Sequence, residues 1–295
     1  MKNKKSPLKG FFIFLLKMIT YPCIQSFLAS NCLGLPKKCL ALQSFTLLRF
    51  FGGILRIHLL DILRGVSVVA MMVYHFIWDL GYFKFIELET VTQGLSLFFA
   101  QCIGVSFIII SGISFRILIL NDKFRKKFLK RISTLVFICI IITSVTFFID
   151  NNSFIFFGIL HFLATCSIIS FLIINVSNKY TLFILFFVSS ALSVANVNYS
   201  LPAYLSWIGF NEDVPRSNDF YPLFPWISFY FFGLWVSEAV RKLLLRYDEK
   251  IFYSLDNLNF FYKSLLFLGK NSLTIYILHQ PIFFSLFLIF IRISS

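Results

Sequence analysis

The sequence predicts an all-α protein, a bundle of helices that crosses a membrane several times. Of its 295 residues, 58% are hydrophobic and only 14% are charged, whereas soluble domains carry about 25% charged residues. Its 41 phenylalanines are more than one soluble core would hold. Apolar runs recur along the chain at about 20 residues, the length that a helix needs to cross a bilayer. These observations predict a polytopic transmembrane protein.

The apolar runs define seven main expected spans. They lie near residues 57–80, 91–120, 132–149, 154–176, 181–195, 220–240 and 264–291. The second and seventh runs are long, so we expect these helices to be tilted, kinked or partly interfacial, with a kink at Pro281. Small residues in the second span favour close helix contacts; they are Gly104, Ser106, Ser111 and Gly112.

The first 55 residues form a separate extension ahead of the transmembrane domain, residues 56–295. The run from Phe11 to Ala29 is long enough to cross a membrane, but basic residues flank it on both sides. An interfacial amphipathic helix is therefore the first interpretation, and an additional span is the alternative. Lys17 interrupts the apolar run and argues against a signal peptide.

The net charge of +14 is concentrated in short loops between apolar spans, which argues against nucleic acid as a partner. Basic residues cluster in the segments that begin at Asn121 and Arg241, whereas acidic residues prevail in the loops of the opposite side. Basic loops face the cytoplasm, so we expect an inner-membrane protein whose C-terminus is extracytoplasmic. The six cysteines are scattered and predict neither a disulfide framework nor a metal site.

Four polar residues interrupt the first span: Asp61, Arg64, His75 and Asp79. At about 100° per residue they fall within an arc of roughly 60°, and they extend over about 27 Å of helix. Residues near the helix ends could reach water, which is the alternative for Asp61 and Asp79. An ionisable stripe along one face of a span more often marks a cavity or a functional site, and this is the interpretation that we favour.

The two ends of the stripe suit different tasks. Arg64 is a permanent cation with a forked set of donors that fits phosphate; an i,i+3 salt bridge with Asp61 is the alternative. His75 suits proton transfer at neutral pH. Asp79, one turn further on, is placed to orient His75, as the carboxylate does in hydrolytic triads.

Two further histidines point to the same outer half of the bundle. His161 and His279 lie at depths compatible with His75, and Asp219 precedes the sixth span from the same side. His161 taken alone is equally compatible with a hydrogen bond to a neighbour. A zinc site is disfavoured because no two histidines show ligand spacing on one helix, so no metal is expected. His58 lies at the cytoplasmic entrance and receives no role.

Five segments resemble those of one known family. They are "LDILRGVSVVAMMVYHFIWDL", "GVSFIIISGISF", "FGILHFLA", "NDFYPLFPWISFYFFG" and "LGKNSLTIYILHQP". In this order they are similar to bacterial membrane proteins related to heparan-alpha-glucosaminide N-acetyltransferase. The resemblance covers roughly residues 56–291, nearly the whole predicted bundle.

The resemblance implies transfer of an acetyl group from cytoplasmic acetyl-CoA to an acceptor outside. In the lysosomal relatives the acceptor is the amino group of a terminal glucosamine. This sequence lacks their large lumenal N-terminal domain, and His75 stands where they carry an asparagine. We therefore expect the acceptor to be the amine or hydroxyl group of a cell-envelope sugar. Membrane lipid is expected to surround the protein. A homodimer is expected from the family resemblance alone.

The expected site follows from these assignments. CoA phosphates would bind at the cytoplasmic mouth, to Asp61, Arg64 and the basic loop with Arg125 and Lys126. His75 would act as base, or a histidine would carry the acetyl group transiently, while His279 or His161 stabilises the oxyanion. Trp78 and Asp219 would bind the acceptor. Three alternatives remain: a transporter or flippase that uses the stripe as a proton relay, an O-acyltransferase of the wider superfamily, and a structural membrane component.

Overall fold

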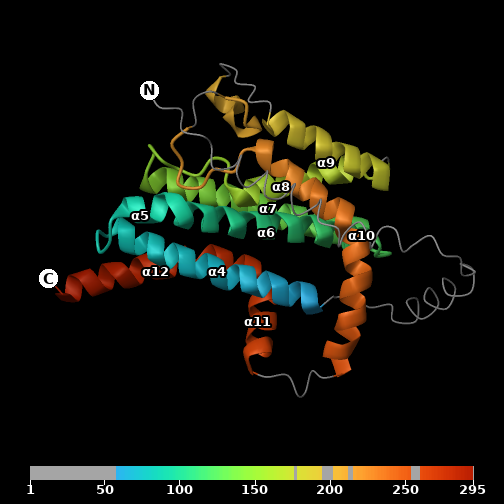
Figure 1. Cartoon of the computed structure of the whole chain (residues 1–295). Coiled ribbons are helices and arrows are strands. Elements are labelled where there is room, and N and C mark those ends of the chain that lie inside the picture. The colour runs from blue at the N-terminus through green and yellow to red at the C-terminus, as the bar shows by residue number, and fades with distance from the viewer. Residues whose placement is uncertain (1–57, 176–177, 195–201, 212–214, 254–259, 295) are drawn as a thin grey trace, which may run out of the picture. The chain divides into compact units, whose positions relative to one another are not determined.

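The computed structural model describes residues 58–175, 178–194, 202–211, 215–253 and 260–294 (Figure 1). The expectations for the extension 1–55 lie outside the described residues. Within the described part every regular element is a helix, which confirms the all-α prediction. The elements are α4 (His58–Tyr82), α5 (Leu88–Thr92), α6 (Gly94–Ile119), α7 (Phe124–Ile149), α8 (Ile159–Leu172), α9 (Lys179–Val194), the 3₁₀ helix η2 (Ala203–Ile208), α10 (Leu223–Tyr253), α11 (Phe260–Lys270) and α12 (Ser272–Ser294).

Five of these helices are long and apolar enough to cross a membrane. They are α4, α6, α7, the part of α10 from Leu223 to Leu243, and α12. The fourth and fifth predicted spans correspond to the shorter apolar helices α8 and α9. Many large apolar side chains on the helices are exposed, among them Leu95 and Phe148 at 85% each. Such a surface suits lipid rather than water, in agreement with a membrane protein.

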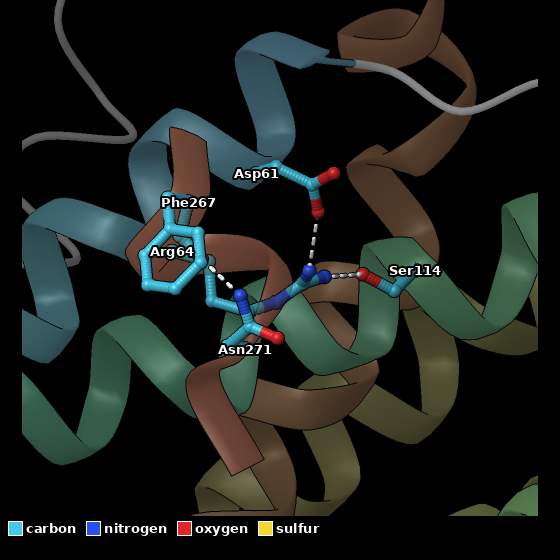
Figure 2. Close-up of polar contacts among 5 residues, drawn as sticks. All are labelled: Asp61, Arg64, Ser114, Phe267 and Asn271. Carbon is cyan, nitrogen blue, oxygen red and sulfur yellow. Dashed lines mark hydrogen bonds and ion pairs between the residues drawn. The ribbon is translucent and has the colours of Figure 1, made fainter. Parts of the chain in front are cut away.

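The seventh predicted span is interrupted at Asn271, whereas the sequence predicted a kink at Pro281, which lies inside α12. Residues 264–291 belong to α11 and α12, which meet at an angle at Asn271 (Figure 1). The Asn271 side chain donates a hydrogen bond to the carbonyl oxygen of Phe267 at 2.9 Å and completes the end of α11 (Figure 2). Gly269, in the last turn of α11, lies directly against the backbone of Asp61 in α4. The apolar sequence continues through this break because α11 buries apolar residues such as Leu265 and Leu266, while α12 exposes apolar residues such as Leu286 and Ile289.

Small residues bring neighbouring helices into backbone contact, as predicted for the second span. A Cβ atom on Gly112 of α6 would lie 2.6 Å from the carbonyl oxygen of Tyr230 in α10. On α10, a Cβ atom on Gly233 would lie 2.5 Å from the carbonyl oxygen of Ile109. At Gly104 a Cβ atom would instead meet the hydroxyl oxygen of the Tyr221 side chain. Helices without bulky side chains at their crossing pack closely and gain dispersion contacts.

Helix α4 holds a central position among the helices that carry the polar residues. It contacts α6, α10, α11 and α12, and its buried face includes Asp61 at 5% and Asp79 at 0% exposed. The polar stripe predicted on this helix therefore faces the protein. Partners for these side chains must come from the neighbouring helices, chiefly α12 at one end and α6 at the other.

Candidate active site

Helices α4 and α12 bring two histidines together. The ring centroids of His75 and His279 lie 4.8 Å apart. The Nδ1 atom of His279 lies 2.8 Å from the carbonyl oxygen of Tyr276 and 3.2 Å from that of Ile275. Both partners are acceptors, so Nδ1 must carry the proton and Nε2 keeps its lone pair in the neutral ring. Nε2 is buried and has no hydrogen-bond partner among the described residues.

A second pair lies directly beside the histidines. The Gln280 side-chain amide donates a hydrogen bond of 2.7 Å to Oδ1 of Asp79, which is fully buried. Asp79 Oδ2 and Gln280 Oε1 remain without partners in the described structure. The carboxylate that was expected to orient His75 is thus engaged by Gln280 of the facing helix instead. The site offers three buried acceptors, which suit a ligand rich in N–H and O–H donors.

Asp219 connects this site to the beginning of α8. Its Oδ2 atom accepts hydrogen bonds from the backbone N–H of Ile159 at 3.0 Å and from the Tyr276 hydroxyl at 3.3 Å. A carboxylate at a helix N-terminus satisfies a free N–H and complements the helix dipole. Burial raises the pKa of Asp219, and the two hydrogen bonds act against that rise. Asp219 therefore fixes Tyr276, whose ring lies 5.8 Å from that of His279.

His161 lies in the first turn of α8 and is occupied on both ring nitrogens. Its Nδ1 atom accepts a hydrogen bond from the backbone N–H of Gly158 at 3.3 Å. Its Nε2 atom lies 3.1 Å from the Thr143 hydroxyl, which itself donates to the carbonyl oxygen of Ile155 at 2.8 Å. The geometry fits a neutral ring protonated on Nε2. This is the hydrogen-bonded alternative foreseen for His161, and its role in the chemistry stays a prediction.

Trp78 belongs to the aromatic contact between α4 and α12. Its ring stacks on Tyr82 with centroids 5.4 Å apart and an interplanar angle of 21°, and Tyr82 packs against Phe284 at 5.3 Å. Trp78 lies one residue before the buried Asp79 on the same helix. Packing against Tyr82 is enough to explain the position of the Trp78 ring. A role of Trp78 in binding the acceptor therefore stays a prediction.

Arg64 marks the other end of α4, about 16 Å along the helix from His75. Its guanidinium pairs with Asp61 at 2.6 Å and donates a hydrogen bond to the Ser114 hydroxyl of α6 at 2.9 Å (Figure 2). The i,i+3 salt bridge that was the alternative for Asp61 and Arg64 is thus present. Arg125 and Lys126 are exposed in the first turn of α7. Binding of phosphate by these residues stays a prediction.

Two site residues were missed in the sequence although they flank a predicted one. Tyr276 and Gln280 lie three positions before and one after His279 in the segment "TIYILHQ". Their spacing shows that they are near His279 along the helix. It does not show that Gln280 faces Asp79 or that Tyr276 reaches Asp219, because these contacts depend on how α12 rotates against α4 and the loop before α10.

The buried His279, the half-buried His75, the buried carboxylate of Asp79 and the half-buried Arg64 lie inside an apolar helix bundle. They define a polytopic membrane protein with an intramembrane polar site. The described residues contain no group of three or more His, Cys, Asp or Glu side chains that could hold a metal ion. The model of the family "heparan-alpha-glucosaminide N-acetyltransferase, catalytic" matches residues 56–281. The match spans most of the chain, so the protein belongs to this family, and the family implies an acetyltransferase. No curated protein and no solved structure matches the chain.

Proposed function

We propose that the protein transfers an acetyl group from acetyl-CoA to the amine or hydroxyl group of a cell-envelope sugar. Family membership supports acetyl transfer. The observation that carries the chemistry is the free Nε2 atom of His279 beside His75. A neutral imidazole whose Nδ1 proton is fixed by a carbonyl oxygen presents a basic, nucleophilic lone pair in a defined direction.

The reaction needs one proton acceptor and one acyl acceptor. As the sugar nitrogen or oxygen attacks the thioester carbonyl, Nε2 of His279 takes the proton that this atom loses. The carbon–sulfur bond then breaks, and the imidazolium returns the proton to the departing CoA thiolate. In the covalent variant, Nε2 itself attacks the carbonyl, the carbon–sulfur bond breaks and CoA leaves as its thiolate. The sugar nitrogen or oxygen then takes the acetyl group from Nε2, and the proton that it loses is the one that neutralises the thiolate overall. The free lone pair serves both routes, which differ in whether an acetylated protein forms without acceptor.

The remaining polar atoms suit the binding of a sugar. Asp79 Oδ2 and Gln280 Oε1 are buried acceptors without partners among the described residues. Hydroxyl and amino groups of a sugar would complete them, and a ligand without such donors would leave them unpaired at a cost of about 1–3 kcal/mol each. Trp78 and Asp219 are proposed to border the acceptor, Asp219 through its hold on Tyr276.

The donor is proposed to enter from the opposite end of α4. Arg64 lies there, with Asp61 and the exposed cations Arg125 and Lys126. An extended pantetheine arm would cover the distance from this end to His279, so that nucleotide and thioester occupy the two ends of one polar stripe. Basic loops favour a cytoplasmic location for the donor end. The acceptor site then opens toward the outside of an inner membrane.

A thiol-release assay tests the proposal. Purified protein receives acetyl-CoA with and without a panel of amino sugars and envelope glycans. We expect release that an acceptor stimulates, and a loss of about 10²- to 10⁴-fold in His279→Gln, the range typical of a missing general base. His58→Gln is the matched control, because it makes the same substitution at the start of α4, outside the site, and should retain activity.

The competing function is a transporter that uses the same stripe for protons. If the folded protein neither binds acetyl-CoA nor releases thiol with any acceptor, the acetyl-CoA proposal is wrong. Proton flux in proteoliposomes that depends on Asp79 would then favour transport. Such flux alongside acceptor-dependent thiol release would not contradict the transferase.

Sidedness has its own test on α7, whose ends lie on opposite sides of the bundle. Lys126 is in the first turn, and Asn151 follows the last turn in an exposed loop. In a variant without native cysteines, Asn151→Cys should react with an impermeant maleimide in intact cells, and Lys126→Cys only after permeabilisation. The opposite pattern would reverse the proposed direction of acetyl transfer.

A further inference from the structure

A second polar cluster, made of a half-buried arginine and buried hydroxyl groups, is formed by α6, α7, α8 and α10, and the proposed chemistry does not use it. Its centre is Arg131, the eighth residue of α7. The Arg131 guanidinium donates a hydrogen bond of 3.1 Å to the Ser111 hydroxyl. No carboxylate pairs with it in the described part of the chain, where the ion pairs are those of Arg64 and Lys242. A cation inside a membrane span is costly and usually marks a functional site.

Two buried hydroxyl groups of this cluster lack hydrogen-bond partners among the described residues. Tyr230 of α10 is 0% exposed and Ser170 of α8 is 3% exposed, and neither hydroxyl completes a hydrogen bond in the described structure. The Tyr230 hydroxyl lies near Arg131 and near the hydroxyls of Ser167 and Ser170, but it has hydrogen-bond geometry to none of them. Buried hydroxyls rarely remain unpaired in a folded protein. Donors around a cation, with no acid among the described residues, form a site suited to an anion.

The packing of α6 fixes this cluster next to Arg64. Ser111 binds Arg131, and Ser114, one helical turn further along α6, binds Arg64. Residues three apart on a helix have Cβ atoms about 5–6 Å from each other. Ser111 also adjoins Gly112, where α6 touches the backbone of Tyr230. The two arginines, from α7 and α4, therefore bind adjacent turns of one helix at the same end of the bundle.

Cations lead from this end of the bundle toward Arg131. The first two turns of α7 carry, beside Arg131, the basic residues Arg125, Lys126, Lys127 and Lys130. Such a concentration of one charge attracts a multiply charged anion and raises its local concentration. Arg131 is the last of these cations and reaches into the bundle.

We propose that Arg131, Ser111, Tyr230 and Ser170 form a phosphate-binding subsite that holds a phosphate group of the acyl donor. This inference rests on the proposed function, because it assigns the donor's phosphates to a place in the fold. The guanidinium offers several N–H groups in one plane, and the hydroxyls of Tyr230 and Ser170 add donors from other helices. A phosphate has enough oxygens to accept from all of them, whereas a halide has no such directional acceptors.

A comparison of two acyl donors distinguishes phosphate binding by Arg131 from a purely structural role. Acetyl-CoA carries phosphates, and acetyl-pantetheine has the same thioester without them. We expect Arg131→Gln to raise the KM for acetyl-CoA by about 10- to 100-fold, as for a lost charge-assisted hydrogen bond, and to leave kcat/KM for acetyl-pantetheine unchanged. Lys179→Gln, at an exposed lysine at the start of α9 outside this cluster, is the matched control and should change either value less than threefold. Equal impairment of Arg131→Gln with both donors would overturn the proposal.

Binding without turnover separates this proposal from the proposed function. CoA and inorganic phosphate should raise the melting temperature of the wild type and not that of Arg131→Gln. That result in a protein without thiol release would leave the phosphate subsite standing and refute only the acetyltransferase. Equal stabilisation of both proteins would refute the subsite. If Arg131→Gln does not fold, Tyr230→Phe is the second variant, because it removes one hydroxyl at nearly constant volume. It should raise the KM for acetyl-CoA about 2- to 10-fold and leave the KM for acetyl-pantetheine unchanged. An unchanged KM for both acyl donors would refute the subsite.

Discussion

The ring centroids of His279 and His75 lie 4.8 Å apart, and Nε2 of His279 has no hydrogen-bond partner among the described residues. The two residues come from helices more than 180 positions apart in the chain, so their pairing is a property of the fold. Of these two rings, His279 alone has its tautomer fixed by backbone carbonyl oxygens within the described part of the chain. The difference predicts separate tasks for the two rings, with His279 as the group that reacts.

Substitution of each histidine tests this division. His279→Gln should lower kcat about 10²- to 10⁴-fold, since it removes the lone pair that takes the proton or the acetyl group. His75→Gln should lower kcat less, because its ring borders the site without a fixed tautomer. Thiol release measured at saturating acetyl-CoA checks the order of the two effects. A larger loss in His75→Gln would return the reacting role to α4, as the sequence alone suggested.

Radiolabelled acetyl-CoA without acceptor separates the two chemical routes. A labelled protein that loses its acetyl group on addition of acceptor would indicate the covalent route through an acetylated histidine. The label should then be missing in His279→Gln and present in His75→Gln. An unlabelled wild type that still turns over would indicate direct transfer.

Asp219 should stabilise the protein through α8 and Tyr276. Asp219→Ala removes the acceptor of the Ile159 N–H and should cost about 0.5–2 kcal/mol, as for the loss of a helix cap. Asp219→Asn keeps one oxygen acceptor and should cost less. Melting temperatures in detergent measure both effects. Equal loss in both variants would indicate that the negative charge, rather than the hydrogen bond, stabilises the end of α8.

The raised pKa of Asp219 gives this comparison a pH dependence. A carboxyl whose pKa is higher in the folded state binds its proton more tightly there than in the unfolded state. Its contribution to stability is therefore greatest below the unfolded pKa of about 3.9 and falls as the pH rises through the folded pKa. The wild type should lose stability relative to Asp219→Asn over that window. A difference in melting temperature that does not change with pH would contradict burial as the dominant cause.

Asp61 and Arg64 should behave as a coupled pair. Asp61 is buried and the Arg64 side chain is 23% exposed, so breaking the pair should cost about 1–3 kcal/mol, less than for a fully buried pair. Asp61→Asn and Arg64→Gln should together destabilise less than the sum of the two single changes. If Arg64 also binds the donor, Arg64→Gln raises the KM for acetyl-CoA and Asp61→Asn does not. Equal KM values in both variants would leave Arg64 with a structural role alone.

Sequence reasoning located the polar face of α4 and could not assign its partners. The 3.6-residue period places Asp61 and Asp79 on one face, and both are buried in the bundle. The partner of Asp79, however, is Gln280, which lies 201 positions away. Local spacing offered His75 instead, because i,i+4 contacts are visible in a sequence and contacts between helices are not.

The break between α11 and α12 escaped sequence reasoning for a similar reason. Hydropathy measures how apolar a segment is, whereas the direction of the chain at Asn271 depends on a side-chain hydrogen bond and on the contact of Gly269 with Asp61. His161 shows the same limit. Its depth in the bundle suggested convergence with His75 and His279, while its ring binds Gly158 and Thr143 at the beginning of α8.

Gly112 should be intolerant of even one methyl group. An added Cβ atom would lie 2.6 Å from the carbonyl oxygen of Tyr230 and 3.1 Å from the backbone nitrogen of Leu234. These are backbone atoms of α10, so relief requires a shift of the helix, at a cost of about 1–3 kcal/mol. The intrinsic preference of helices for alanine, about 1 kcal/mol, offsets only part of this. Gly112→Ala should therefore lower the melting temperature of the purified protein.

Gly81→Ala is the matched control for this change. Its Cβ atom would meet the side chains of Leu88 and Val91 at 3.2 and 3.3 Å, and side-chain ends can move where backbone cannot. We expect Gly81→Ala to be neutral or to cost less than half as much as Gly112→Ala. Because Gly112 adjoins Ser111, a shift of α10 would also displace Tyr230 from Arg131, so Gly112→Ala should raise the KM for acetyl-CoA more than that for acetyl-pantetheine. Equal melting temperatures for the two variants would contradict the close backbone packing of α6 against α10.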